Sequence, residues 1–447
     1  MRALEFDEQM RTLLGDAEWQ QMQVALDKPP VVSVRANAKC PNAHTQGTPV
    51  PWSSLGYYLD ERPEFTLDPR FHAGGYYVQE ASSMFVEQAL RQCGNPKLVL
   101  DLCAAPGGKS TLLRSLLADE ALLVCNEPVK ARANVLRENI IKWGHEGCFV
   151  SCNFPRDFSQ LKGMFDLVLV DAPCSGEGMF RKEQNAIDMW SPANVEDCSV
   201  RQRDIVEAIW PALKEGGYLI YSTCTYNTLE DEENVCYFCD SLGAELVEIP
   251  VAADWNISGS LLRGFNGPVY RFIPHKTRGE GFFLALMRKT SSEPLVRVKD
   301  KATAASIAGE WCGCLDAADM ISIEHDHTMY AVHAAHAPLV SRLAKTLYPL
   351  HFGVALYENK GRKSVPHHSL AMSRLLVKDA YPTARLSLSD ALSYLRHEAI
   401  VIDAPRGYVL VTYEGMPLGF VNNIGNRANN LYPSEWRIRS TKRHPLE

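Results

Sequence analysis

The sequence predicts an α/β protein built on a doubly wound parallel sheet, and three observations lead to this prediction. Apolar runs of strand length alternate with helical patterns through the middle of the chain. A glycine-rich turn joins the first of these runs to a helix. Acidic and thiol side chains directly follow several of the runs, and open sheets of this kind bind ligands at the carboxyl ends of their strands.

Composition and charge limit what the protein can be. A chain of 447 residues with 46% hydrophobic and 22% charged residues is typical of a globular protein with two to four domains. No apolar run approaches the roughly 18 residues that a membrane span needs, and the N-terminus "MRALEFDEQMRTLLGDAEW" lacks the apolar core of a signal peptide. We therefore expect a cytoplasmic protein without a membrane segment.

Cysteine usage favours free thiols. The chain has 13 cysteines, an odd number, and in a reducing compartment most of them should be small buried hydrophobes. "CYFC" (236–239) and "CGC" (312–314) each lack the second pair of ligands that a zinc site needs. The sequence therefore predicts no metal site.

Residues 1–75 form the first predicted unit, which begins helical and then contains the short strand "PPVVSVRAN". Residues 76–290 form the predicted core. The predicted core strands are KLVLDL, ALLVCNE, CFVSCN, MFDLVLVD, GGYLIYST, AELVEI and GFFLALMR. Between them lie helices such as "VKARANVLRENIIKWG", with Pro128 near its start and Gly144 after its end.

The last third of the chain divides into three predicted segments. Residues 291–306 are polar and predict a linker. Residues 307–378 have an α+β pattern. Residues 379–447 form a short β-rich unit, with a helix at "LSDALSYLRHE" and strands at "AIVID", "YVLVTYEG" and "PLGFVNN".

The glycine-rich turn "DLCAAPGGKS" (101–110) predicts a nucleotide-type loop, because glycine lets a ligand approach the backbone and a helix N-terminus. It is not a Walker A loop, since Cys103 stands where that motif needs glycine, and G-x-G-x-x-G is also absent. Glu127 follows the next strand, where an acidic residue accepts hydrogen bonds from ribose hydroxyls. We expect an adenosine-bearing cofactor without phosphates; the alternative is a tight turn with an exposed Glu127.

Two thiols follow strands of the same predicted sheet, Cys174 in "DAPCSGEG" and Cys224 in "YSTCTY". A thiol is nucleophilic as the thiolate, which a cation such as Lys109 would favour. The alternative is a pair of small buried hydrophobes, the usual state of cysteine. Asp171, just before Ala-Pro-Cys, has two interpretations, a carboxylate for the edge of a nucleobase or a turn cap.

The blocks "CAAPGGK", "DAPCSGEGMFRK" and "YSTCTYNTLEDEENV" resemble, in this order, the signatures of RNA 5-methylcytosine methyltransferases, most of all the bacterial 16S rRNA type (RsmF-like). "PPVVSVRAN" resembles the end of that group's N-terminal RNA-binding segment, and "PLGFVNNIGNRANNLYPSEWRIR" resembles its PUA-like unit. The resemblance implies a Rossmann-like class I methyltransferase core with an N-terminal α+β segment and C-terminal α+β and PUA-like domains. It is weakest over 291–378.

The resemblance also implies a cofactor, S-adenosylmethionine, and the residues that hold it. Glu127 would bind the ribose with Arg132 nearby, and Asn153 would approach the adenine, although relatives often have Asp there. Asp171 would close the cofactor site and face the cytosine. The cofactor loop would comprise Cys103, Ala104, Ala105, Pro106, Gly107, Gly108 and Lys109.

In the RNA-type enzymes the nucleophile is the Thr-Cys cysteine, here Cys224, whereas DNA cytosine methyltransferases use the Pro-Cys cysteine, here Cys174. The presence of both is typical of the RNA type. Cys224 would attack carbon 6 of the base so that carbon 5 can accept a methyl group, and Cys174 would assist the later release. Lys109 and Asp171 would orient the base.

The expected partner is rRNA, in the small ribosomal subunit or its assembly intermediate, and the expected state is a monomer. A net charge of −7 requires any basic surface to be local, and the tail with Arg427, Arg437 and Arg439 is the best candidate for RNA binding. The alternatives are a tRNA cytosine methyltransferase, a non-catalytic ribosome-assembly factor, a DNA methyltransferase and a nicotinamide oxidoreductase. Cys224 argues against the DNA enzyme, and the missing G-x-G-x-x-G argues against the oxidoreductase.

Overall fold

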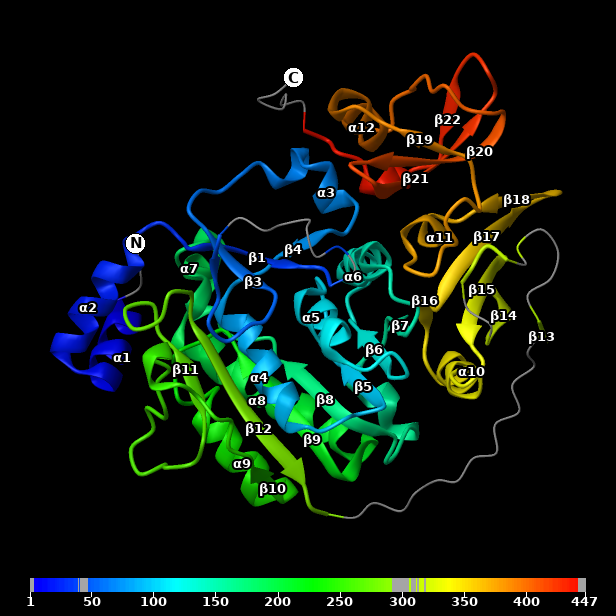
Figure 1. Cartoon of the computed structure of the whole chain (residues 1–447). Coiled ribbons are helices and arrows are strands. Elements are labelled where there is room, and N and C mark those ends of the chain that lie inside the picture. Colours follow the sequence, from blue (N-terminus) through cyan, green and yellow to red (C-terminus); the bar gives the residue numbers. More distant parts are fainter. Residues whose placement is uncertain are drawn as a thin grey trace.

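The computed structural model describes residues 4–38, 40, 47–291, 305–306, 311, 313–316 and 319–440. Its centre is a mixed sheet with the strand order β10-β12-β9-β8-β5-β6-β7-β16, to which β11 is added beside β12 (Figure 1). The sheet's strands are β5 (Leu98–Asp101), β6 (Leu122–Asn126), β7 (Cys148–Ser151), β8 (Phe165–Asp171), β9 (Leu213–Thr223), β10 (Ala244–Leu246), β11 (Tyr270–Phe272), β12 (Phe282–Lys289) and β16 (Pro349–Phe352).

Five neighbouring strands, β9, β8, β5, β6 and β7, run parallel, so their carboxyl ends lie along one edge of the sheet. Their apolar runs are buried, as expected for parallel strands covered on both faces. One hydrophobic core contains residues of α4, α5 and α6 and the other contains residues of α8, α9 and α10. The helices are α4 (Val86–Gln92), α5 (Gly108–Leu116), α6 (Lys130–Trp143), α7 (Gln184–Met189), α8 (Pro192–Ile209), α9 (Glu232–Leu242) and α10 (Ala337–Thr346).

The predicted doubly wound core is therefore confirmed, including the details that local sequence specifies. Helix α6 ends where Gly144 adopts a left-handed conformation (φ 77°) and its amide donates to the carbonyl of Ile140.

The N-terminal unit packs directly on the core. Its helices α1 and α2 share an apolar cluster with Phe180, Trp190 and Tyr226 of the core. Its strands form a small sheet of order β2-β3-β1-β4. The elements are α1 (Leu4–Leu14), α2 (Asp16–Leu26), β1 (Val32–Ala36), β2 (Thr48–Pro49), β3 (Gly56–Leu59), α3 (Pro69–His72) and β4 (Tyr76–Val78).

The region after the core forms a third sheet, of order β13-β14-β15-β17-β18, but its strand β16 joins the core sheet antiparallel to β7. The predicted linker lies largely outside the described residues, which resume at 305. The elements are β13 (Ala305–Ser306), β14 (Met320–His325), β15 (Thr328–His333), β17 (Val354–Lys360), β18 (Lys363–Pro366) and α11 (His368–Met372).

The C-terminal unit is a sheet of order β19-β20-β21-β22 with one covering helix, α12. The predicted strand at "AIVID" is wrong: only Ile400 makes an isolated bridge, to Ala428, and Val401 is 76% exposed. Pro405 lies just beyond, so the segment turns and the sheet is completed by β19 and β22 instead. The elements are β19 (Thr383–Arg385), α12 (Leu388–Leu395), β20 (Gly407–Tyr413), β21 (Met416–Asn423) and β22 (Ala428–Asn430).

Candidate active site

The glycine-rich loop runs from the end of β5 to the start of α5. Gly107 adopts a left-handed conformation (φ 115°), and a side chain at Gly108 would lie 3.3 Å from the ring of Tyr77. The loop's carbonyl groups are held from α6, because Arg132 donates to the oxygen of Ala105 (3.0 Å) and Asn139 donates to that of Pro106 (2.8 Å). The loop thus brings the chain close to the N-terminus of α5. The left-handed backbone at Gly107 disfavours any residue with a side chain, and a Cβ at Gly108 would press on Tyr77.

Asp101 lies at the end of β5 under this loop and is fully buried. Ser110 donates to one of its carboxylate oxygens (2.7 Å), and the other oxygen has no protein partner among the described residues. Burial raises the pKa of Asp101 to about 7, although the Ser110 hydrogen bond opposes the shift. A buried acceptor without a partner is what a ligand with hydroxyl or ammonium donors would satisfy.

Glu127 follows β6, one strand along, and is 2% exposed. The amide of Val129 donates to its Oε1 (3.0 Å), while Arg132 lies 3.6 Å from its Oε2. The alternative of an exposed Glu127 in a simple turn is therefore wrong. Its carboxylate retains acceptor capacity at the carboxyl ends of the strands.

Asn153 lies beyond β7, and its side chain makes protein contacts on both sides. Its Oδ1 accepts from the amide of Tyr348 (2.8 Å), and its Nδ2 donates to Asp157 (3.1 Å). Asn126, which the sequence analysis did not single out, is fully buried and donates to the carbonyls of Leu102 and Asn153. Asn126 therefore connects the glycine-rich loop to the segment after β7. In the sequence, only its position one residue before Glu127 could have indicated this role.

The two thiols predicted to meet do so. The Sγ atoms of Cys174 and Cys224 are 3.0 Å apart, and the amide of Cys224 donates to the Cys174 sulfur (3.4 Å). They are brought together because β8 and β9 are parallel neighbours, with Asp171 opposite Ser222. The hydrogen bond that the Cys174 thiol makes with the Cys224 sulfur, together with burial, raises the pKa of Cys174 well above its ordinary value. Cys174 is therefore held as a neutral thiol beside Cys224.

Lys109 and Asp171 form an ion pair of 2.7 Å next to these thiols. Ser222 donates to the other oxygen of Asp171 (2.8 Å), and the Lys109 ammonium lies 5.3 Å from the centre of the Phe282 ring. Burial would lower the pKa of Lys109, but Asp171 outweighs it and raises the pKa above its ordinary value. Lys109 is therefore held as an ammonium group that is paired with Asp171.

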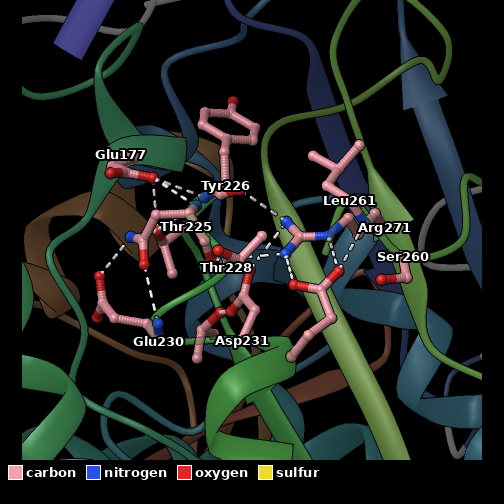
Figure 2. A network of polar contacts seen from close by, with 12 residues as sticks. Glu177, Thr225, Tyr226, Thr228, Glu230, Asp231, Ser260, Leu261 and Arg271 are labelled. Carbon is pink, nitrogen blue, oxygen red and sulfur yellow. Dashed lines mark hydrogen bonds and ion pairs between the residues drawn. The ribbon is translucent and has the colours of Figure 1, made fainter. Parts of the chain in front are cut away.

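The loop that carries Cys224 is held by one buried carboxylate, that of Glu177 (Figure 2). Its Oε2 accepts from the hydroxyl of Thr225 (2.6 Å) and from the amides of Tyr226 (2.7 Å) and Asn227 (3.0 Å). Its Oε1 accepts from Trp190 and from Gln9 of α1. The sequence analysis missed Glu177, although it stands inside the "DAPCSGEG" block.

The acidic run after the Cys224 loop is buried as well (Figure 2). Glu230 accepts from the amide of Ser175 (3.0 Å), which joins the Cys174 loop to the Cys224 loop. Arg271, 1% exposed, pairs with Asp231 (2.9 Å) and with Glu232. Arg271 also donates to the carbonyl of Tyr226 (2.9 Å). Both thiol loops are therefore fixed by one buried polar network.

Other predicted features lie elsewhere. Arg427, Arg437 and Arg439 are exposed on the C-terminal unit, on different elements from those that carry the thiols. In the described part of the chain no cluster of three or more histidine, cysteine or acidic residues could hold a metal ion. Within the same ranges no helix is long and apolar enough to cross a lipid bilayer.

The site combines a glycine-rich loop after the first strand of a parallel sheet with an acidic residue after the second strand. A pair of thiols lies beside a Lys–Asp ion pair at the same edge. These features define the class of Rossmann-like, S-adenosylmethionine-dependent methyltransferases. The chain belongs to the 16S rRNA methyltransferase RsmB/F family, whose sequence model matches residues 89–288. Models of the N-terminal domain of 16S rRNA methyltransferase RsmF and of the methyltransferase RsmF PUA domain match residues 3–81 and 381–438.

Relatives and solved structures agree with this membership. The chain is 32% identical over 409 residues to ribosomal RNA small subunit methyltransferase F of Salmonella typhi, covering 87% of this chain and 84% of the relative. The protein of the same name from Escherichia coli O157:H7 is 30% identical over 417 residues, with the same coverage. The predicted family, fold, cofactor and rRNA methyltransferase class are thereby confirmed.

Two crystal structures from Pyrococcus horikoshii share the fold. A methyltransferase homolog protein has 26% identity and a TM-score of 0.54, covering 64% of this chain and 95% of its own. NSun6 with SFG has 21% identity and a TM-score of 0.54, covering 65% of this chain and 99% of its own.

Proposed function

We propose that the protein transfers a methyl group from S-adenosylmethionine to carbon 5 of a cytosine in 16S rRNA through a covalent cysteine–cytosine intermediate. The observation that carries the proposal is the pair of thiols 3.0 Å apart beside the Lys109–Asp171 ion pair. Carbon 5 of cytosine is a poor nucleophile, and a thiol that adds to carbon 6 overcomes this difficulty.

The first half of the reaction belongs to Cys224. Its thiolate forms a bond to carbon 6, and the electrons of the 5,6 double bond move toward the ring nitrogen, where Lys109 and Asp171 orient the base and assist protonation. The resulting enamine makes carbon 5 nucleophilic, and S-adenosylmethionine supplies the methyl group. The base must be unpaired or flipped to reach these side chains.

The second half belongs to Cys174. The proton on carbon 5 must leave, and its electrons restore the double bond as the Cys224–carbon 6 bond breaks. The main cause of the raised pKa of Cys174 is the hydrogen bond with the Cys224 thiol, and that hydrogen bond disappears once Cys224 is bound to the base. Cys174 is then easier to deprotonate, which suits a base that promotes release.

The cofactor would lie against the glycine-rich loop. The unpartnered oxygen of buried Asp101 and the acceptor capacity of Glu127 suit the ammonium and ribose hydroxyl donors of S-adenosylmethionine, so the residues fit the group. Glu127 would bind the ribose, and Arg132 would fix Glu127 and the loop. Asn153 would approach the adenine through the part of its side chain that Tyr348 and Asp157 leave accessible.

The wider assignments are also part of the proposal. The protein acts as a monomer in the cytoplasm, on the small ribosomal subunit or an assembly intermediate. RNA phosphates are contacted by Arg427, Arg437 and Arg439. Because the protein has a net charge of −7, RNA binding requires a local basic surface of this kind.

One denaturing gel tests the roles of the two thiols. Cys224→Ala should abolish methylation of 16S rRNA and form no covalent RNA–protein complex, because the first bond cannot form. Cys174→Ala should still attack and methylate, so a covalent complex should accumulate when S-adenosylmethionine is present. Cys236→Ala, a half-buried thiol on α9, is the matched control and should turn over normally.

The outcomes separate the alternatives. A covalent band from Cys224→Ala, or none from Cys174→Ala, would count against the assignment. Normal turnover by both variants would mean that the thiols are only buried hydrophobes. Bisulfite sequencing of rRNA treated with the wild-type protein identifies the methylated base.

A further inference from the structure

A groove of about 530 Å³ lies between α2 and the segment 274–279, and it belongs to no site described so far. Its volume is within the range of ligand-binding pockets. Four cationic side chains line it: Lys28 from the end of α2, Arg181 from the loop after Cys174, and Lys276 and Arg278 from the opposite wall. No aspartate or glutamate is among the described residues that line it.

The cations differ in what holds them. Lys28, Lys276 and Arg278 are exposed, so their charges face the groove and solvent. Lys276 is paired with Glu18 (2.5 Å), and the Arg278 guanidinium lies 4.4 Å from the centre of the Tyr58 ring. Burial lowers the pKa of His275 below its ordinary value, so this wall residue is neutral at pH 7. The groove is a local basic surface on a protein of net charge −7.

The groove is joined to the catalytic loops by direct contacts. Arg181 donates to the carbonyls of Ala25 (3.1 Å) and Gly279 (2.6 Å), so it connects both walls. Gly281, two residues after Gly279, lies close to the Cys224 loop. Both segments approach Gly178, where an added Cβ would lie 2.6 Å from the Gly281 carbonyl oxygen and 2.9 Å from the Cys224 carbonyl oxygen.

The next residue, Phe282, faces the ammonium of Lys109. Strand β12, which begins at Phe282, pairs with the end of β9 just before Cys224. The floor of the groove therefore continues, within three residues, into the wall of the candidate active site, at the same edge of the sheet.

We propose that this groove binds the phosphodiester backbone of the RNA strand next to the target cytosine. The inference rests on the proposed function, because it takes RNA as the substrate. Lys276 is paired with Glu18, and the buried Arg181 is paired with Glu280 (2.7 Å), so Lys28 and Arg278 are the exposed cations that remain for phosphates. A strand held by them would lead its neighbouring nucleotide toward Cys224. Exposed Gln21 on one wall adds a neutral hydrogen-bonding group for a sugar.

The test replaces two charged side chains of the groove by neutral polar ones. The groove variant is Lys28→Gln/Arg278→Gln, and the control is Lys162→Gln/Lys345→Gln, which removes two exposed lysines from other surfaces. Transcribed 16S rRNA is titrated at several salt concentrations, and S-adenosylmethionine binding is measured by calorimetry. The groove variant should bind RNA about tenfold more weakly at low salt, with a salt slope smaller by about 1 to 2, because two phosphate contacts are lost.

Cofactor affinity and melting temperature should stay at the wild-type values. RNA affinity and salt slope equal to those of the control variant would overturn the proposal, and the proposed function would stand. The same titration with an acidic polypeptide should show no loss in the groove variant; a larger loss than for RNA would assign the groove to a protein partner and overturn the proposal. Failure of the wild-type protein to form 5-methylcytosine in 16S rRNA, both free and in the small ribosomal subunit, would instead overturn the proposed function.

Discussion

The two halves of the site are built differently. Around the thiols, buried carboxylates are held by protein donors or a counter-charge: Glu177 accepts five hydrogen bonds, and Asp231 and Glu232 are paired with Arg271. On the cofactor side, Asp101 and Glu127 are as deeply buried but keep acceptor capacity that the protein does not use. The difference indicates that one half fixes the position of the two thiols, including the proposed nucleophile Cys224, whereas the other leaves acceptors free for a ligand.

The largest effect should follow the loss of the positive charge of Arg271, which balances the buried carboxylates near the thiols. Arg271→Met leaves Asp231 and Glu232 buried without a counter-charge, so the free energy of unfolding should fall by about 3 to 5 kcal/mol. Urea denaturation measures it. Arg288→Met, an exposed arginine that stacks on Tyr218, is the control and should change stability by less than about 0.5 kcal/mol. Equal effects of the two variants would remove the distinction between the halves.

Next in size is the change at the carboxylate that holds the Cys224 loop. Both carboxylate oxygens of Glu177 accept hydrogen bonds from protein donors. In Glu177→Gln one oxygen becomes an NH₂ group, which cannot accept from those donors, so the Cys224 loop should shift. The rate of covalent complex formation should fall about 100-fold, because small displacements of a nucleophile have effects of this order. Affinity for S-adenosylmethionine should not change.

A single-turnover assay with rRNA measures that rate, and Glu183→Gln, an exposed neighbour, is the control. A variant that loses stability but keeps the wild-type rate would show that Glu177 is structural only. Partial recovery of the rate in Glu177→Asp, which keeps the charge, would support its role in positioning Cys224.

On the cofactor side, removing an acceptor should weaken binding without unfolding the core. Glu127→Ala should raise the dissociation constant of S-adenosylmethionine about 10- to 100-fold, as expected for the loss of a hydrogen bond to a charged group. Calorimetry measures the constant, with Glu196→Ala on the surface of α8 as the control. Unchanged affinity would show that Glu127 does not bind the ribose.

The smallest effect concerns pH. The pKa of Asp101 is about 7 in the folded protein, above its unfolded value of about 3.9, so the folded state binds the extra proton between these values. The contribution of Asp101 to stability therefore declines as pH rises from about 4 to about 7. Asp101→Asn should flatten this part of the stability profile relative to wild type in ligand-free protein. If the stability of Asp101→Asn and of the wild type changed with pH in the same way, the raised pKa of Asp101 would be contradicted.

Much of this was predictable because it depends on local sequence. Apolar runs such as that of β8 specify the buried strands, and Gly144 specifies the end of α6. The meeting of Cys174 and Cys224 follows from two parallel neighbouring strands that end together. Roles in binding and catalysis rest on the resemblance and remain predictions.

The remainder depends on tertiary contacts that no local pattern encodes. The acidic run 230–232 is typical of a solvated helix start, and its burial requires Arg271, about 40 residues away along the chain. Asn126 and Glu177 act through partners that only the fold brings near. The "AIVID" segment has strand propensity, but it meets β22 only at the single bridge from Ile400 to Ala428 and does not continue as a strand.

The pairing of β16 with β7 has a consequence for biosynthesis. Strand β7 lies at the edge of the parallel part of the core sheet. Strand β16 (Pro349–Phe352), roughly 200 residues later in the chain, pairs with this edge, and the Phe352 ring stacks on that of Phe149. Because a ribosome adds about 5 to 20 residues per second, the nascent core exposes an unpaired strand edge for about 10 to 40 s before its cover emerges. An open edge of this kind invites aggregation, so the nascent chain needs protection during that interval.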